Sequence, residues 1–543
     1  MHHLRSFILL ITLLTFSGCA APTKLLVRRD LEKHGEKFKF EEAQDHIVWF
    51  LIDGVNTTVF RKLLEKGGLP NIYRHVYRRG IFTWAAMASH PPSTYPNVAA
   101  QLTAKFPGHI GVPNNHYLDI EHEDRLNLVE YPGVLKAREL LKHEQTIFQY
   151  LRSQNLYSVS VTDLVSTSAN IQVIDLFKTG LREINRQWRD IDRKTFADLT
   201  DVLKETAKTD QLPTLMFAHL IGPDSVGHIE GVGSPAYVES LKFLDKEFGK
   251  FVTLLDQLDY YHNVAFVISV DHGQLPIKNK FDFDKFFYEL IHEKPSGYCV
   301  THHCDIDDGK MNDVVVLHGA ERDAFIYLGV KDYQSFYRKR WSERKSFEEL
   351  VHYSLPSGAK ANLIQALTNE KAVGLVFLRE SDSQFHVFSR AGHGIIKRRL
   401  VNERPFYTYL VVSGDDPLGL HLTRMPASEE YFSSRAWLKM TEHSDYPDSV
   451  AQFPELFQTP KTGDIVVYAA PGYSFATENL SGHGGGTRPE MYTPFLFGGD
   501  GIPHLDLGPF RTIDITPTIL HYLGFAVYPP TKIDGISAFE PSL

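Results

Sequence analysis

Four short polar segments each follow an apolar, strand-like run of the chain. Between them they contain three aspartates and three histidines: Asp53, Asp224, His228, Asp271, His272 and His483. Parallel strands bring their carboxyl ends to one edge of a sheet, so we expect these side chains to converge there. Carboxylates and imidazoles without cysteine suit zinc. Each segment alone is also typical of an ordinary turn, but the whole set predicts a zinc site.

The spacing within two of these segments supports that prediction. Asp224 and His228 are four residues apart, so a helical turn would direct both side chains the same way. Asp271 and His272 are neighbours and would diverge on a continuous strand, but Gly273 permits the strand to end there.

Thr94 is the candidate nucleophile. It follows Pro91-Pro92-Ser93 and precedes Tyr95-Pro96-Asn97, where an apolar, helix-compatible stretch begins. A helix N-terminus favours an anion, so a hydroxyl there is placed for phosphoryl transfer. The other interpretation is an ordinary helix cap, for which threonine is common.

Strand and helix patterns alternate along the first half of the chain. Apolar strand-like runs at 46–52, 157–161, 214–221 and 264–270 are separated by helical patterns at 57–79, 143–154, 190–209 and 235–258. This alternation predicts an α/β fold with a mainly parallel central sheet flanked by helices.

From about residue 275 to 460 the pattern changes to short alternating runs, at 373–378, 385–388 and 407–412. They are typical of antiparallel hairpins, so we interpret 276–460 as a mixed α/β insertion or cap. An apolar run at 464–469 and a helical pattern at 512–524 indicate a return to the core. The predicted catalytic core is therefore 46–275 together with 461–543.

The N-terminal residues predict export. The apolar run from Phe7 to Phe16 is too short to span a bilayer and is typical of a secretory signal. Ser17-Gly18-Cys19 resembles the bacterial lipoprotein cleavage box, which implies loss of residues 1–18 and a lipid on Cys19, with 19–45 as a partly helical tether. The alternative is an ordinary cleaved signal. Either way we expect the protein at the cell envelope, facing the periplasm or the surface.

Composition limits the possible binding partners, and the spacing of the remaining cysteines limits their possible roles. The 543 residues are 43% hydrophobic and 23% charged, with a net charge of −9, which disfavours long nucleic acids as partners. Cys299 and Cys304 enclose His302 and His303. A disulfide or two unreacted thiols are favoured over a metal site. A structural zinc site would need a second pair of ligands at a similar short spacing, and the sequence has none near these residues.

The order of these motifs resembles the alkaline phosphatase superfamily, and within it the nucleotide pyrophosphatase/phosphodiesterase branch, whose nucleophile lies in a Thr-x-Pro-Asn segment. The resemblance covers 46–275 and 462–535. It implies one zinc on Asp224, His228 and His483, and another on Asp53, Asp271, His272 and the Thr94 oxygen, with other divalent metals left open. It also implies a phosphate-binding role for Asn115, with Asn114 as the alternative.

The mechanism implied is attack by Thr94 on phosphorus, a phosphothreonine intermediate, and its hydrolysis by water. Two zinc ions would activate the hydroxyl and stabilise the leaving oxygen. The N–H groups at the helix start and Asn115 would hold the remaining phosphoryl oxygens.

The reaction class follows from residues that are absent. Sulfatases need a Cys/Ser-x-Pro-x-Arg segment, and this window reads Thr94-Tyr-Pro-Asn-Val98. A related monoesterase branch carries a Lys-x-Arg pair where this chain has Ser160-Val-Thr162-Asp-Leu164, so diesters are favoured. A phosphomonoesterase, a phosphoethanolamine-type transferase and a non-catalytic binding lipoprotein remain alternatives. Nucleotides, sugar-nucleotides and lipid head groups are all candidate substrates.

Overall fold

The structure is a computed structural model that describes residues 25–28, 46–120, 124–130, 133–175, 179, 182, 185–291, 299–300, 314–329, 344–355, 358–427, 430–476, 479–525 and 533–539. Cys19 and Cys304 lie outside the described residues, and for Cys299 only the backbone is described. Export, the lipid on Cys19 and the state of Cys299 and Cys304 therefore stay predictions. Within the described ranges, no helix is both long and apolar enough to cross a bilayer.

The larger sheet has ten strands in the order β1-β7-β6-β8-β2-β9-β25-β3-β26, with β27 also paired to β3. The central strands from β7 to β9 are parallel, whereas β1 and β25 pair antiparallel with their neighbours. The predicted α/β fold is confirmed, with antiparallel strands toward both sides of the sheet. Its strands are β1 (Leu25–Arg28), β2 (His46–Ile52), β3 (Gly80–Met87), β6 (Ser158–Val161), β7 (Ile171–Ile174), β8 (Leu215–Leu220), β9 (Val264–Val270), β25 (Tyr492–Gly498), β26 (Leu505–Asp506) and β27 (Phe510–Arg511).

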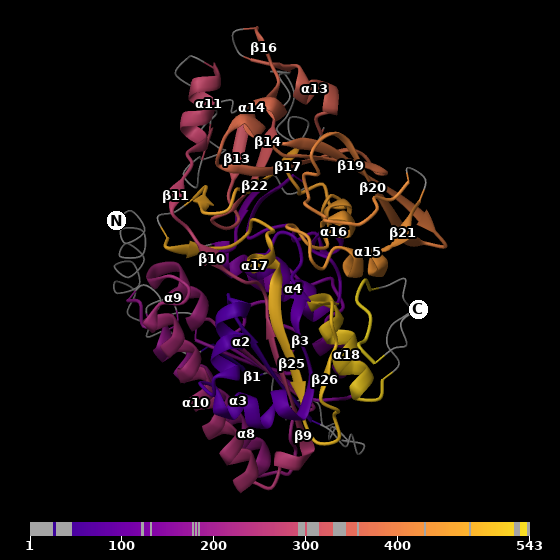
Figure 1. Ribbon diagram of the computed structural model, residues 1–543. Coiled ribbons are helices and arrows are strands. Elements are labelled where there is room, and N and C mark those ends of the chain that lie inside the picture. Colours follow the sequence, from indigo (N-terminus) through magenta and orange to yellow (C-terminus); the bar gives the residue numbers. More distant parts are fainter. Residues whose placement is uncertain are drawn as a thin grey trace.

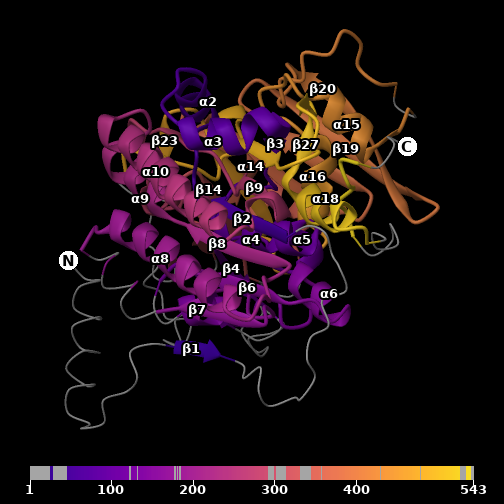
Figure 2. The same cartoon turned by 90° about the horizontal axis from the view of Figure 1, so that it is seen from below.

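Helices cover both faces of this sheet because successive side chains of a strand point to opposite faces. Val48, Phe50 and Ile52 of β2 pack in one apolar cluster with helices α2, α3, α8 and α10. Ile47, Trp49 and Leu51 pack in another with α4, α6 and α18, and Figure 2 shows the two layers on either side of the strands. The helices are α2 (Thr57–Glu65), α3 (Pro70–His75), α4 (Thr94–Thr103), α6 (Ile147–Ser153), α8 (Trp188–Ala207), α10 (Pro235–Gln257) and α18 (Ile515–Tyr522).

A second sheet of nine strands lies above the first in Figure 1, in the order β12-β13-β14-β22-β17-β18-β19-β20-β21. The antiparallel hairpins expected in the insertion are present, for example β17 with β18 and β19 with β20. The strands are β12 (Cys299–Val300), β13 (Val314–Leu317), β14 (Asp323–Leu328), β17 (Val373–Ser381), β18 (Gln384–Phe388), β19 (Gly392–Val401), β20 (Arg404–Gly414), β21 (Phe432–Ser433) and β22 (Ile465–Ala469).

One expectation about this region is wrong. We expected the apolar run 464–469 to return to the catalytic sheet, but β22 lies in the second sheet, between β14 and β17. A fully buried strand reads the same in either sheet, because periodicity does not say which neighbours cover it. The domain limits of 276–460 and 461–543 stay predictions, and the second sheet extends across the boundary between them.

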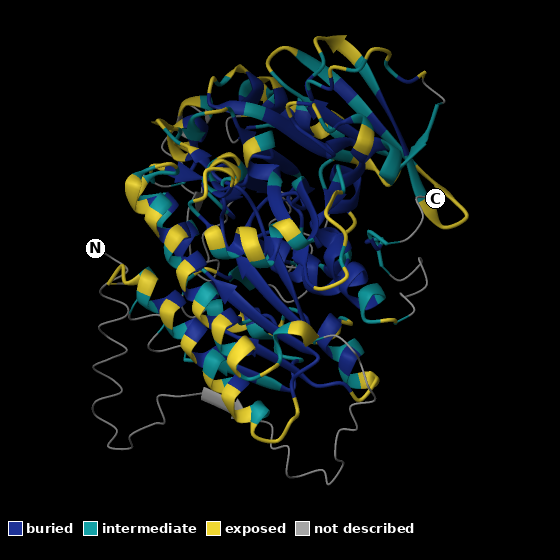
Figure 3. Cartoon of the chain, turned by 60° about the horizontal axis from the view of Figure 1, so that its bottom comes forward, coloured by how far each residue is buried: buried dark blue, intermediate teal, exposed yellow. Residues whose placement is uncertain are grey.

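The second sheet is also covered on both faces. Its two apolar clusters join it to α11, α13 and α14 on one side and to α15 and α16 on the other. In Figure 3 the strands of both sheets are largely buried, and exposed residues lie mainly on the outer faces of helices and on loops. These helices are α11 (Phe283–Ile291), α13 (Phe347–Val351), α14 (Leu363–Asn369), α15 (Ser434–Met440) and α16 (Ser449–Leu456).

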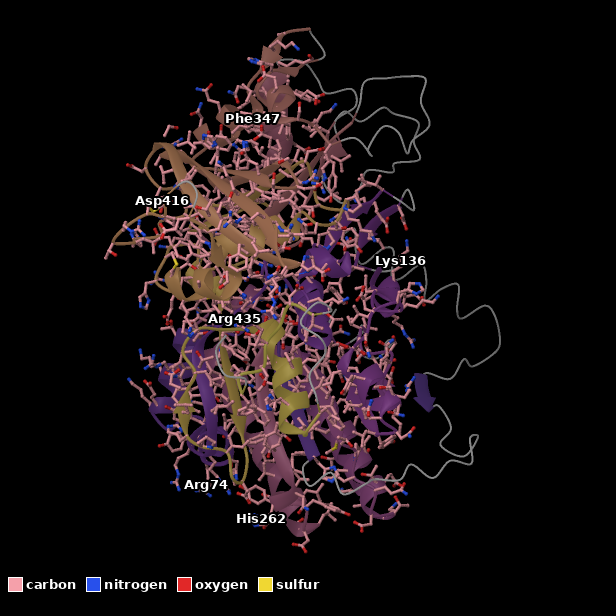
Figure 4. All side chains as sticks on the ribbon, turned by 90° about the vertical axis from the view of Figure 1, so that its right-hand side faces the viewer. Arg74, Lys136, His262, Phe347, Asp416 and Arg435 are labelled. Atoms are coloured by element: carbon pink, nitrogen blue, oxygen red, sulfur yellow. The ribbon has the colours of Figure 1, made fainter. Side chains whose placement is uncertain are left out.

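Ion pairs with buried carboxylates join the two sheets. Arg511, at the end of β27, donates twice to Asp448 at the start of α16, at 2.6 and 2.7 Å. Arg435 of α15, labelled in Figure 4 at the junction, donates to Asp514 beside α18. The second sheet is therefore anchored to the first by desolvated charges as well as by apolar contacts.

His109 forms another junction. It lies in α5 (Pro107–Ile110), with Nε2 2.7 Å from Glu455 of α16 and Nδ1 2.7 Å from Asp534 near the C-terminus. Burial lowers the pKa of His109, but the two carboxylates raise it from 6.5 to about 10. The pKa of Glu455 is lowered from 4.5 to about 2. Burial alone would raise it, but the hydrogen bonds and charges of His109 and Arg398 lower it by more.

These directions predict a pH-dependent loss of stability in His109→Gln. A raised histidine pKa stabilises the fold fully below the unfolded pKa of 6.5, and that contribution disappears as the pH rises through about 10. Glu455 must be ionised, so the contribution is largest between about pH 5 and 6.5. We expect a loss of about 3 kcal/mol there, declining toward pH 10, in denaturant unfolding monitored across that range.

His262→Gln is the matched control. His262 pairs with Asp500 at 2.5 Å but is 72% exposed, so solvent screens the pair. It lies at the lower edge of the molecule in Figure 4. Equal losses in both variants, or a His109→Gln loss that does not depend on pH, would contradict the assignment.

Candidate active site

Two groups of possible metal ligands lie at the carboxyl ends of the central strands. The first cluster is Asp53, Asp271 and His272, and the second cluster is Asp224, His228 and His483; within each, one donor atom per residue lies within 4.8 Å of the others. The structure thus brings together all six residues expected from their position after apolar runs.

Strand pairing places the first cluster. β2 and β9 are parallel neighbours with Ile52 opposite Val270, so Asp53 and Asp271 leave the sheet side by side. Gly54 follows with a φ of +59°, a region that favours glycine. A Cβ there would lie 2.1 Å from a carboxylate oxygen of Asp224. This glycine is what allows the two clusters to approach each other.

Each carboxylate of the first cluster has one oxygen held and one oxygen free. Asp271 Oδ1 accepts the backbone N–H groups of Gly54 and His272, at 3.1 and 2.9 Å, and Asp53 Oδ2 lies 3.2 Å from His219 Nε2. The other oxygens, Asp53 Oδ1 and Asp271 Oδ2, are buried without a hydrogen-bond partner. Both lie 3.4 Å from His272 Nε2.

The second cluster lies on a helix and on a loop. Asp224 and His228 are one turn apart on α9 (Gly222–Glu230), as expected, with Asp224 Oδ2 3.1 Å from His228 Nε2. His483 follows β24 (Ser481–Gly482), which pairs with β10 (Leu275–Pro276) just after His272. The rings of His272 and His483 stack at 3.7 Å, so the two clusters are adjacent.

Backbone carbonyls fix the histidines of the second cluster. His228 Nδ1 lies 3.0 Å from the carbonyl oxygen of Ser481, and His483 Nδ1 lies 2.9 Å from that of Pro92. This leaves Nε2 of both rings to face the cluster, which is how ligating histidines are usually held.

The electrostatics of the first cluster fit a divalent cation. Burial and the charge of Asp224 raise the pKa of Asp53, and burial and the charge of Asp53 raise the pKa of Asp271. Carboxylates that repel one another in a buried site are stabilised by a cation between them. The free oxygens and Nε2 atoms match the oxygen and nitrogen ligands of zinc.

Thr94 lies beside the first cluster. It is the first residue of α4, after the N-cap Ser93, and its Oγ1 is 3.1 Å from His272 Nε2. Asn97 holds the preceding loop by donating to the carbonyl oxygens of Ser89, Pro91 and Ser93, at 3.2, 3.0 and 2.9 Å. The hydroxyl and both free carboxylate oxygens therefore share one neighbour, His272 Nε2, at 3.1 to 3.4 Å.

The expectation of several free N–H groups at this helix start needs correction. The Tyr95 N–H donates to Asn115 Oδ1 at 2.9 Å, Pro96 has no N–H, and the Asn97 N–H bonds the Ser93 carbonyl. Among the described residues, only the N–H of Thr94 in this turn has no protein acceptor.

Asn115 and Asn114 have different surroundings. Asn114 is fully engaged: its Oδ1 accepts from Ser93 Oγ and the Asn115 N–H, and its Nδ2 donates to Asp323 of the second sheet. Asn115 uses its oxygen for the Tyr95 N–H, and no bond to its Nδ2 is found within the described ranges. Its amide N–H groups thus remain available beside Thr94.

Sequence reasoning missed two further groups. His219 of β8 lies between the first cluster and Asp163, 3.6 Å from its carboxylate; burial lowers the pKa of His219, and these carboxylates raise it to about 10. Its signal was a histidine within the buried run Ala218-His219-Leu220. Glu321, between β13 and β14, lies beside the second cluster, and no pattern near it pointed there.

The second sheet also supports the loop that precedes Thr94. Gln452 of α16 accepts from the His90 N–H at 2.9 Å and donates to the Ala88 carbonyl at 3.1 Å. His90 Nδ1 lies 3.2 Å from the Tyr468 hydroxyl of β22. The inserted sheet therefore helps to position the loop that carries Thr94.

The chain resembles known proteins in sequence. A family model described as Type I phosphodiesterase / nucleotide pyrophosphatase matches residues 47–392, which extends past residue 275 into the second sheet. GPI ethanolamine phosphate transferase 1 of Schizosaccharomyces pombe is 26% identical over 18% of this chain. Ectonucleotide pyrophosphatase/phosphodiesterase family member 3 of Mus musculus is 24% identical over 38% of it. These matches span 11% and 22% of the two relatives.

Solved structures share the fold. Murine ectonucleotide pyrophosphatase/phosphodiesterase 5 superposes with a TM-score of 0.55 at 13% identity, covering 89% of this chain and 96% of that one. An inactive variant of the same murine protein, in complex with AMP, gives a TM-score of 0.52 at 12% identity with the same coverage.

The donor sets predict metal-dependent stability. We expect about two zinc ions per chain, measured by elemental analysis. Their removal by a chelator should lower the melting temperature, since a metal at a hundred times its Kd stabilises the native state by about 2.7 kcal/mol. Asp271→Asn should retain about one zinc, because its free oxygen faces only the first cluster.

Asp506→Asn serves as the control, because Asp506 is exposed in β26 at the far edge of the sheet. Two tightly bound zinc ions in Asp271→Asn, or a melting temperature that the chelator leaves unchanged, would count against the ligand assignment.

Proposed function

We propose, since the chain belongs to the Type I phosphodiesterase/nucleotide pyrophosphatase family of the alkaline phosphatase superfamily, that it hydrolyses phosphodiesters at a two-zinc site through a phosphothreonine intermediate. The observation that carries the proposal is the convergence of Thr94 Oγ1, His272 Nε2 and the two free carboxylate oxygens of Asp53 and Asp271.

When bound, zinc at the two clusters would act as a Lewis acid toward the Thr94 oxygen and toward the leaving oxygen. Thr94 Oγ1 attacks phosphorus; a bond forms between them, the bond to the leaving alcohol breaks, and the alcohol takes up the threonine proton. Water then attacks the phosphothreonine, releases the phosphate product and restores the hydroxyl. The Thr94 N–H and Asn115 Nδ2 bind the phosphoryl oxygens throughout.

A diester is the favoured substrate because of the charges around the site. The segment 160–164, where a related monoesterase branch has two cations, lies next to the first cluster through the contact of Asp163 with His219. It offers a carboxylate, and the charge of His219 is already balanced by Asp163 and Asp53. A monoester dianion would find less compensation here than a diester monoanion.

Nucleotide diesters are the first substrate class to examine. A structural neighbour, the murine family member 5, has been solved in complex with AMP, and this supports a nucleotide product. Residues 1–24 lie outside the described ranges, so action at the cell envelope, with a lipid on Cys19, is carried forward from the sequence alone.

A second candidate is transfer of the phosphoryl group to another alcohol. The match to GPI ethanolamine phosphate transferase 1 favours it, and the same residues would serve, with the alcohol replacing water in the second step. Capture of the phosphoryl group by an added alcohol, in preference to water, would distinguish transfer from hydrolysis.

Thr94→Ala tests the nucleophile. We expect kcat for bis-p-nitrophenyl phosphate to fall at least about a thousandfold, because no other group replaces the attacking oxygen. The wild type should hydrolyse this diester faster than p-nitrophenyl phosphate. Thr58→Ala is the matched control, since Thr58 is an exposed threonine in the first turn of α2.

Retained diesterase activity in Thr94→Ala would exclude the phosphothreonine route. Faster monoester hydrolysis by the wild type would make the protein a phosphatase. Zinc binding with neither ester cleaved would shift the assignment to transfer or to a non-catalytic binding role.

Asn115→Asp tests the amide donor separately from the fold. The variant keeps an oxygen for the Tyr95 N–H but replaces the amide donor with a charge that repels phosphate. Removing one such donor typically lowers the rate by about 10²–10³, and we expect at least this loss in kcat/KM with an unchanged zinc content. An activity close to wild type would remove Asn115 from the mechanism.

A further inference from the structure

Glu321 reaches the second cluster from the inserted sheet. It lies in the turn between β13 and β14, and two backbone hydrogen bonds hold the chain at this point. The Glu321 carbonyl accepts from the Phe475 N–H at 2.7 Å, and the Arg322 N–H donates to the His483 carbonyl at 3.0 Å. The turn therefore runs directly alongside the loop that carries His483.

The two carboxylate oxygens of Glu321 have different surroundings. Oε1 accepts from Asn479 Nδ2 at 3.0 Å and lies 3.4 Å from His228 Nδ1. Oε2 is buried without a hydrogen-bond partner and lies 3.9 Å from His483 Nε2, the ring nitrogen that faces the cluster. The side chain is only 11% exposed. A buried, unpaired carboxylate oxygen is costly unless a cation is nearby.

We propose that Glu321 Oε2 is a fourth protein ligand of the metal held by Asp224, His228 and His483. A four-coordinate zinc holds its oxygen and nitrogen ligands at about 2.0–2.2 Å, which places the ligand atoms roughly 3.3 Å from one another. Oε2 lies 3.9 Å from His483 Nε2, but Glu321 is not in the group whose donor atoms all lie within 4.8 Å of one another. Ligation therefore requires the glutamate side chain to rotate toward the cluster.

Gly482 makes room for this arrangement. A Cβ at that position would lie 2.8 Å from Glu321 Cβ and 2.9 Å from Oε2. Only a residue without a side chain lets the glutamate close against the loop at this point.

The ligand would change both coordination and charge. A catalytic zinc site keeps one position for substrate or water, so a leaving oxygen would displace Glu321 or share the metal with it. With Asp53, Asp224 and Asp271, Glu321 makes four carboxylates around two divalent ions, which brings the formal charge of the site to zero. Such a site binds a diester monoanion more readily than a monoester dianion.

The experiment compares the full-length wild type with Glu321→Gln, which keeps the size of the side chain and removes its charge. Metal content is measured after dialysis against graded chelator concentrations, and the absorption spectrum is recorded after replacement of zinc by cobalt. We expect Glu321→Gln to release one of its two metals at least about tenfold more readily, with a changed cobalt spectrum from that site.

Glu380→Gln is the control, because Glu380 is a half-exposed glutamate of the same sheet that pairs with His386; it should behave as wild type. Glu321→Asp keeps the charge but shortens the side chain, and should give an intermediate loss of metal. It also serves as the test if Glu321→Gln does not fold.

The inference rests on the proposed function in one respect, that a metal occupies the second cluster. If the wild type binds two metals and Glu321→Gln matches it in affinity and cobalt spectrum, this inference alone is overturned. If the wild type binds no metal in the second cluster, the two-metal function and this inference fall together.

Discussion

The site is organised around the mutual repulsion of the carboxylates of Asp53, Asp224 and Asp271, of which Asp53 and Asp271 are buried and Asp224 is partly exposed. They lie close together just after apolar strands, and positive charge among them offsets this repulsion. The residues around these carboxylates fix the direction in which each carboxylate oxygen points. His219, Gln274 and the N–H groups of Gly54 and His272 each hold one carboxylate oxygen. The oxygens that remain free face the imidazole nitrogens, so the protein orients these side chains toward one another.

Rigid elements supply this orientation. β2, β8 and β9 are parallel, buried on both faces and in register, and they deliver Asp53, Asp271 and the start of α9 to one edge. Because the helical layers on the two faces pack against alternate residues of the same strands, a shift of one strand would disturb both apolar clusters. The Asp and His side chains are thereby fixed by the core, and Thr94 lies beside them after a loop that its own hydrogen bonds and the second sheet hold in place.

The second sheet takes part in the site. Gln452 and Tyr468 support the loop before Thr94, Asp323 engages Asn114 beneath Asn115, and Glu321 lies against the second cluster. The sheet is attached to the first through buried ion pairs such as Arg511 with Asp448. Because both charges are desolvated, the pair is stable only when the two side chains keep this geometry. Residues of the second sheet therefore contact both the loop before Thr94 and the second cluster directly.

The sequence by itself determined the local features: the apolar strands, the six Asp and His residues that follow them, the threonine at a helix start and the α/β fold. These follow from periodicity and from the rule that parallel strands end at one edge, so they need no knowledge of distant contacts. Tertiary structure alone decided the rest. It placed β22 in the second sheet. It also bonded Asn114 to Asp323 and paired the Tyr95 N–H at the start of α4 with the oxygen of Asn115, whose amide N–H groups remain available. It also brought His219 and Glu321 to the site. These outcomes depend on pairs such as Glu321 and His483, which are more than a hundred residues apart and share no local pattern, so only the packed chain brings them together.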